Sequence, residues 1–99
     1  MIKAKVIFVG LVQRLVGCRE EVFLLPQEST LGELLEQLVA RFGPAFEEHI
    51  IENGELGREA NVLIDGCNAL GQGGLLAKLG NGPQTEVQIV MLAPPLMGG

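Results

Sequence analysis

The residues best suited to chemistry close the sequence, where Pro94-Pro95-Leu96-Met97-Gly98-Gly99 ends on two glycines. Successive prolines cannot donate to a sheet ladder, so they end a preceding strand and hold the chain extended. Gly98 and Gly99 have no side chain, which makes this arm thinnest and most pliable beside its carboxylate. Such an arm can be threaded along a narrow channel into the active site of another protein. There its carboxylate can attack the α-phosphate of ATP and become an acyl adenylate, which a sulfur or amine nucleophile then displaces.

The residues before the arm form an apolar strand pattern, Val87-Gln88-Ile89-Val90-Met91-Leu92. This strand with its arm resembles the C-terminus of the ubiquitin-like sulfur carriers. Within that family the sequence is most like the small subunit of molybdopterin synthase, and the thiamine-pathway carrier is a sibling. A terminal Gly-Gly alone is weak evidence. A strand, two prolines, two apolar residues and then Gly-Gly form a more specific pattern than an ordinary frayed tail.

The resemblance implies that the chain is a protein cosubstrate and not an enzyme. An E1-like enzyme would adenylate Gly99 with ATP, and a sulfurtransferase or desulfurase would supply the sulfur of a Gly99 thiocarboxylate. The large subunit of molybdopterin synthase would then take the arm into its active site, where the thiocarboxylate sulfurates a cyclic pterin precursor. No cofactor bound by the chain itself is implied. The residue before Gly-Gly is often small in this family, so Met97 requires a channel that accepts a flexible thioether.

Several alternatives to this role remain. The sulfur could serve another pathway, such as thiamine, cysteine or tRNA thiolation. The same adenylate also leads to a protein modifier that is joined to lysines through Gly99, as ubiquitin is. A plain interaction domain would lose its terminal Gly-Gly without consequence. The sequence offers no metal cluster, no catalytic triad and no paired acid–base carboxylates, so a free-standing enzyme is disfavoured.

The length and composition indicate one small folded domain. Ninety-nine residues leave no room for a second domain, and we divide the chain into a body, 1–93, and an arm, 94–99. Apolar residues make up 47% of the chain and charged residues 19%, a balance that allows a packed core and disfavours disorder. There is no Trp or Tyr, so the core must be built from Leu, Ile and Val.

The net charge of −5 disfavours nucleic acid as a direct partner and suits a partner with a basic surface. No apolar run is long enough to span a membrane, and the first residues enter a strand pattern without a signal peptide. Cys18 and Cys67 are far apart, which indicates reduced thiols in a cytoplasmic protein. Neither cysteine lies in a motif that activates a thiol, and His49 has no nucleophile placed beside it.

The clearest element is a helix that begins after Thr30. Thr30-Leu31-Gly32-Glu33 is a capping box, in which the Thr hydroxyl and the Glu carboxylate each accept from the backbone of the other residue. Apolar residues then recur at helical spacing on one face, and Gly43-Pro44 ends the helix. The members of that face are Leu31, Leu34, Leu35, Leu38, Val39 and Phe42.

The remaining patterns complete a β-grasp fold, an α+β class with a mixed sheet of four to five strands and one main helix across one face. The first strand, Ile2–Val9, and the last, Thr85–Leu92, are apolar on both sides and should be buried neighbours in mid-sheet. The other expected pieces are a connector over 11–17, strands over 19–25 and 61–65, a short helix within 44–52, a mobile loop over 53–60, a short strand at Ala69 and Leu70, and a loop from Gly71.

One helix can cover only one face of so small a sheet, although both faces carry apolar residues. We expect the second set to include Ile7, Val9, Phe23, Leu25, Val90 and Leu92, and part of it to be an exposed docking patch beside the arm. The predicted partner-binding residues are therefore Phe23 and Leu92 on the body and Pro95, Leu96, Met97 and Gly98 on the arm.

Overall fold

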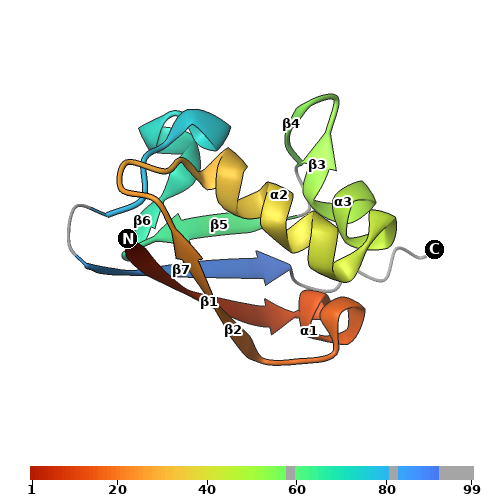
Figure 1. Ribbon diagram of the computed structural model, residues 1–99. Coiled ribbons are helices and arrows are strands. Elements are labelled where there is room, and N and C mark those ends of the chain that lie inside the picture. The colour runs from red at the N-terminus through yellow and green to blue at the C-terminus, as the bar shows by residue number, and fades with distance from the viewer. Residues whose placement is uncertain (58–59, 81–82, 92–99) are drawn as a thin grey trace.

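A computed structural model of the protein describes residues 1–57, 60–80 and 83–91. Leu92 and the arm, 94–99, lie outside the described residues. Two layers make up the described part: a twisted sheet, and a group of helices that lie on one side of it (Figure 1). The helix layer is dominated by α2, which crosses the sheet diagonally.

Five strands form the main sheet, in the spatial order β2-β1-β7-β5-β6. β1 and β7 are parallel neighbours in its middle, as predicted, and the other pairs are antiparallel. The strands are β1 (Ile2–Gly10), β2 (Glu20–Leu25), β5 (Asn61–Ile64), β6 (Cys67–Asn68) and β7 (Gln84–Met91). A mixed sheet of this kind confirms the α+β class, with the main helix packed across one face.

The two central strands bury alternate residues beneath the helices. In β1 the side chains of Ile2, Ala4, Val6 and Phe8 are fully buried. In β7 the buried residues are Thr85, Val87, Ile89 and Met91. Because side chains along a strand alternate between faces, the residues between these positions face the other side of the sheet.

α2 (Leu31–Phe42) begins at the predicted capping box. The Glu33 N–H donates to the Thr30 hydroxyl at 3.3 Å, and the Thr30 N–H donates to the Glu33 carboxylate at 3.1 Å. The predicted apolar face packs on the sheet, with Leu31, Leu34, Leu35 and Leu38 buried and Val39 and Phe42 half-buried at its edge. The ring of Phe42 meets Phe8 of β1 edge to face, 5.7 Å between centroids.

Two segments have more regular structure than predicted, and one short helix lies where it was expected. The connector after β1 is a helix, α1 (Leu11–Val16), whose Val12 is buried. The expected short helix is α3 (Pro44–Ile50). A two-stranded ribbon pairs β3 (Ile51–Glu52), at the end of the segment expected to hold the helix, with β4 (Glu55–Leu56), within the segment expected to be a mobile loop. Its turn residues Asn53 and Gly54 both have positive φ, 54° and 79°, as a tight type I′ hairpin turn requires.

The short strand expected at Ala69 and Leu70 is two residues earlier, at Cys67–Asn68. Asp65 and Gly66 both have positive φ and form another two-residue turn, so pairing resumes at once with Cys67 opposite Ile64. The chain then enters two 3₁₀ turns, η1 (Ala69–Gln72) and η2 (Gly74–Leu76). The Asn68 side chain caps the first of them by accepting from the Leu70 N–H at 2.9 Å.

Candidate functional site at the end of the central strand

The root of the arm is the end of β7, which the sheet holds from both sides. Val90 pairs with Val9 of β1 and with Asn61 of β5, and Met91 pairs with Gly10. Met91 is buried, so the last described residue is fixed in the core. The chain beyond it therefore starts from a rigid position in mid-sheet. The predicted site residues Leu92, Pro95, Leu96, Met97, Gly98 and Gly99 lie beyond that point and stay predictions.

A small apolar patch lies beside this root, on the sheet face that points away from α2. Its members are Ile7, Val9, Leu63 and Val90, which we call the arm-side patch. They are joined by the register of the sheet, since Val9 lies opposite Val90, and Gln88 lies between Ile7 and Leu63. Val9 is 37% exposed and the others are half-buried. Three of the four are apolar residues in the central strands, as the predicted surplus of apolar groups required.

The predicted position of Phe23 on this outer face is wrong. Phe23 lies opposite Ala4 and Leu25 opposite Ile2, so both residues share the core face, where Phe23 is half-buried and Leu25 is buried. The outer face of β2 carries Val22 and Leu24 instead, 50% and 58% exposed. The cause is the antiparallel pairing with β1, which sets the face of each β2 residue. Partner binding through Phe23 therefore loses its structural rationale.

Charge on the outer face is concentrated away from the root of the arm. Lys3 lies opposite Leu24, and Lys5 lies between Val22 and Glu86, near the beginnings of β1 and β7. The Lys5 ammonium lies 3.5 Å from the Glu20 carboxylate, an exposed ion pair that contributes little to stability. The arm-side patch is thus the apolar end of a face whose other end is mixed and charged.

A carboxylate that the sequence analysis missed fixes the beginning of β7. Asp65 accepts from the Thr85 hydroxyl at 2.9 Å and from the Glu86 N–H at 2.9 Å, and its own N–H donates to the Glu86 carbonyl. A β-carbon on Gly80 would lie 2.7 Å from the same carboxylate, so only glycine leaves room there. No local pattern in the sequence indicates this role of the Asp65 side chain, because it depends on β7, which lies far along the chain.

The two cysteines differ in their surroundings, and no disulfide joins them. Cys18 is half-buried, and burial raises the pKa of its thiol; the nearby Glu21 raises it further, whereas Arg41 partly offsets the rise. Cys67 is exposed in β6. A raised pKa means less thiolate at neutral pH, so Cys18 is poorly suited to nucleophilic chemistry.

No group of three or more His, Cys, Asp and Glu side chains within 1–57, 60–80 and 83–91 is arranged to hold a metal. Among the helices of these same segments, none is long and apolar enough to cross a membrane.

The mixed five-stranded sheet with its crossing helix defines the β-grasp fold of ubiquitin-like proteins, which confirms the predicted architecture. No protein-family model matches the chain, and neither does any curated protein. The solved structures that it resembles include the small archaeal modifier protein 1 of Methanosarcina acetivorans, with a TM-score of 0.74 and 25% identity over 100% of this chain and 98% of that one.

Two further structures extend the comparison. A putative molybdopterin converting factor, subunit 1, from Pyrococcus furiosus has a TM-score of 0.71 and 20% identity, covering 94% of this chain and 100% of its own. A chain of the Amycolatopsis orientalis BexX/CysO complex has a TM-score of 0.73 and 16% identity, covering 92% and 97%. The resemblance to ubiquitin-like carriers that the arm suggested is therefore matched by the fold of the body.

Proposed function

We propose that this chain is a cytoplasmic sulfur-carrier protein that acts through a thiocarboxylate at Gly99. The observation that carries the proposal is the combination of a β-grasp body with a Pro-Pro-Leu-Met-Gly-Gly arm that follows its central strand. β7 ends at Met91 in the middle of the sheet, so the body presents the arm from a fixed point. The chain itself would be a cosubstrate, and the catalytic groups would belong to its partners.

The proposed chemistry has two steps. A carboxylate is a poor acyl donor, so an E1-like enzyme first directs a Gly99 oxygen onto the α-phosphorus of ATP, and pyrophosphate leaves. The outer sulfur of a persulfide on a donor enzyme then attacks the acyl carbon and AMP leaves, which forms an acyl disulfide. A thiol attacks the donor sulfur of that S–S bond, so the thiocarboxylate leaves and a disulfide remains on the donor. The charged groups that stabilise these transfers are preorganised in the partner enzymes. The carrier needs only a rigid body and a slim arm.

The arm-side patch is the surface that we propose for docking on these partners. It lies at the end of the sheet from which the arm starts, and an exposed apolar patch commonly marks a partner site. A partner seated on Val9 and Val90 would hold the root of the arm beside the entrance of its own active-site channel. Once the body is docked in this way, insertion of the arm into the channel is an intramolecular step and no longer requires a separate encounter.

The reaction can be tested on the full chain. Incubation with its cognate activating enzyme, ATP and the sulfur donor should replace one oxygen of the C-terminal carboxylate by sulfur. Intact mass spectrometry detects the exchange, and fragmentation of the C-terminal peptide places it on Gly99. A reaction without ATP is the control. Sulfur found on Cys18 or Cys67 instead would overturn the proposal.

Molybdopterin biosynthesis is the pathway that we propose for the sulfur. The arm motif supports it, and so does the resemblance to a structure titled as a putative molybdopterin converting factor, subunit 1. In this role the chain is the small subunit of molybdopterin synthase and its partner is the large subunit. Thiocarboxylated chain mixed with that subunit and the cyclic pterin precursor should yield the dithiolene product. Carriers of the thiamine, cysteine or tRNA thiolation pathways would give no product in this assay.

A protein modifier joined through Gly99 is the second candidate. The observation that favours it is the fold shared with a structure titled small archaeal modifier protein 1. Both roles begin with the same adenylate, and they differ in the nucleophile that attacks it, which is sulfur for a carrier and a lysine amine for a modifier. Isopeptide-linked ladders that contain this chain, recovered from cells of its source and lost on deletion of Gly98 and Gly99, would establish the modifier role.

A further inference from the structure

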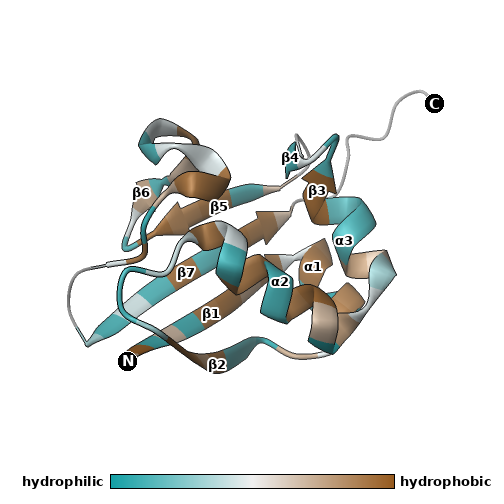
Figure 2. Ribbon diagram, turned by 45° about the horizontal axis from the view of Figure 1, so that its top comes forward, coloured by the Kyte–Doolittle hydropathy of each residue, from teal (hydrophilic) through white to brown (hydrophobic). Residues whose placement is uncertain are grey.

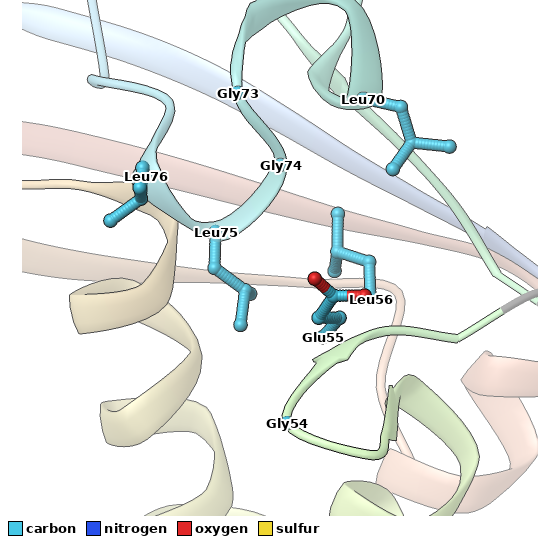
Figure 3. A pocket seen from close by; sticks show the side chains of 8 residues that line it. All are labelled: Gly54, Glu55, Leu56, Leu70, Gly73, Gly74, Leu75 and Leu76. Atoms are coloured by element: carbon cyan, nitrogen blue, oxygen red, sulfur yellow. The ribbon is translucent and has the colours of Figure 1, made fainter.

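The helix side of the molecule carries a groove that the proposed function does not use. One part is a hollow of 520 Å³ between the β3–β4 ribbon and the 3₁₀ turns η1 and η2. Leu56, Leu70 and Leu75 reach this hollow from three different segments, and the Glu55 carboxylate lies beside Leu56 (Figure 3). Leu70 is 64% exposed, and Leu76 on the rim is 80% exposed. A partner that covers side chains as exposed as these removes apolar surface from water, which makes the free energy of binding more favourable.

A second hollow, of 300 Å³, continues the first along α2. The two share Leu75, and the second is also lined by Val39 of α2 and Ile51 of the ribbon. Leu75 can lie between them because η2 rests directly on α2 at Gly32. A β-carbon at Gly32 would stand 3.1 Å from the Leu75 carbonyl oxygen, so a larger residue there would push the two segments apart by a few tenths of an ångström. We call the two hollows together the leucine groove.

Every charged residue that lines the leucine groove in the described part of the chain is a carboxylate. Glu55 lines the first hollow, and Glu36 and Glu47 line the second. Glu20, Glu21 and Glu28, which do not line the groove, each form an ion pair with a lysine or arginine. In the ribbon Glu55 also lies directly opposite Glu52, and like charges in that position repel each other. A cation brought to the rim would relieve that repulsion.

We propose that the leucine groove binds a basic amphipathic segment of a partner protein. Its apolar side chains would fill the two hollows, and its lysines or arginines would lie on Glu36, Glu47 and Glu55. Amphipathic helices commonly bind in this way, with their apolar side chains in a hydrophobic groove and their charged side chains at its rim. The complementary charges would steer the segment and set its direction.

The groove and the arm-side patch lie on opposite sides of the sheet. α2 covers one face of the sheet (Figure 2). Ile7, Val9, Leu63 and Val90 belong to the other face, because they alternate along their strands with the residues buried on the α2 side. A partner on the groove would therefore leave the other face and the root of the arm free. The chain can bind two proteins at once, one through each face, and the inference does not depend on sulfur chemistry at Gly99.

The probe for this site is a short synthetic helix with leucines on one face and lysines on the other. Titrated into ¹³C-methyl-labelled full chain, it should shift the methyl resonances of Leu56, Leu70 and Leu75 and leave those of Val22 and Leu24 in place. A leucine–glutamate helix of equal length should not bind. Affinity for the lysine peptide should fall as salt is raised. Shifts centred on Val22 and Leu24 would overturn the proposal.

Matched charge variants separate the groove from the overall acidity of the protein. The double variant Glu36→Lys with Glu55→Lys should lose at least tenfold in affinity for the lysine peptide. The control, Glu20→Lys with Glu86→Lys, makes the same change in net charge on the sheet side and should lose much less. Equal losses in both would mean that only net charge attracts the peptide. Leu70→Ser, at an exposed position, gives a second groove variant that keeps the fold, and it too should weaken binding.

Discussion

Val9 and Val90 face each other across the parallel β1–β7 ladder, one pair before the ladder ends at Gly10 and Met91. Both strands lie in mid-sheet, so the two side chains keep a fixed position relative to the root of the arm. They are also on the outer face, where Val9 is 37% exposed. A partner that binds this surface would therefore lie at a fixed distance from the root of the arm. Substitutions of this pair are the direct test of docking.

Aspartate at either position should therefore weaken binding to the activating enzyme about tenfold or more, because a charge would be buried at the contact. The fold should survive, with free energies of unfolding lowered by less than about 1.5 kcal/mol at these partly exposed sites. Binding is measured by calorimetry and stability by urea unfolding. Leu24→Asp, at the other end of the outer face, is the control and should bind normally. Equal loss in that control would place the docking surface elsewhere.

Deletion of Gly98 and Gly99 should abolish adenylation while the thermal unfolding midpoint of the body hardly moves. The two residues carry no side chains, so their loss removes no apolar surface from the core. ATP–pyrophosphate exchange by the activating enzyme measures the first effect, and calorimetry the second. A large fall in the unfolding midpoint would mean that the arm is packed into its own domain.

Gly80→Ala should destabilise the protein by about 1–3 kcal/mol. The new β-carbon would stand 2.7 Å from the Asp65 carboxylate, which must then move away from the Thr85 hydroxyl and the Glu86 N–H. Gly71→Ala is the matched control, because nothing lies within 4 Å of the added carbon there. Denaturant midpoints compare the two variants. Similar midpoints would show that the Asp65 contacts contribute little to the start of β7.

Cys67 should be alkylated before Cys18 at neutral pH. Burial and the nearby Glu21 raise the pKa of the Cys18 thiol, so its thiolate, the reactive form, is scarce there and becomes abundant only at more alkaline pH. Mass spectrometry of iodoacetamide-treated protein at a series of pH values measures both rates. Glu21→Gln should lower the Cys18 pKa and speed its labelling at neutral pH. Preferential labelling of Cys18 in the unaltered chain would contradict this assignment.

The elements that the sequence predicted well are those whose signals are local. The capping box of Thr30 and Glu33 and the leucine spacing after it lie within one helix, and the two-sided apolar pattern of Ile2–Val9 is typical of a central strand. The strand β2 was predicted, but the face of its residues was not, because Val22, Phe23, Leu24 and Leu25 are all apolar. Alternation along the strand then does not show which residues face the core, and the pairing with β1 determines this instead.

The candidate site was predictable in part. The apolar members of β1 and β7 on the outer face follow from their alternation, whereas Leu63 enters the patch only through pairing with β7. The ribbon was missed because the Asn53-Gly54 signal is flanked by strands of only two residues. The leucine groove depends on the approach of Leu75 to Gly32, a contact between segments that no spacing in the sequence indicates.

The pairing of β1 with β7 also has a consequence for how the protein is made. Lys3 pairs with Gln84, which the ribosome adds roughly eighty residues later. At ordinary rates of synthesis this pairing is delayed by about 4–16 s. Until then the apolar residues of β1 lack their central neighbour, so the sheet cannot be completed during most of translation. A nascent chain released before β7 would be left to chaperones and proteases. Chains that stop before β7 therefore cannot complete the sheet or form the arm-side patch, so they cannot compete for the partners.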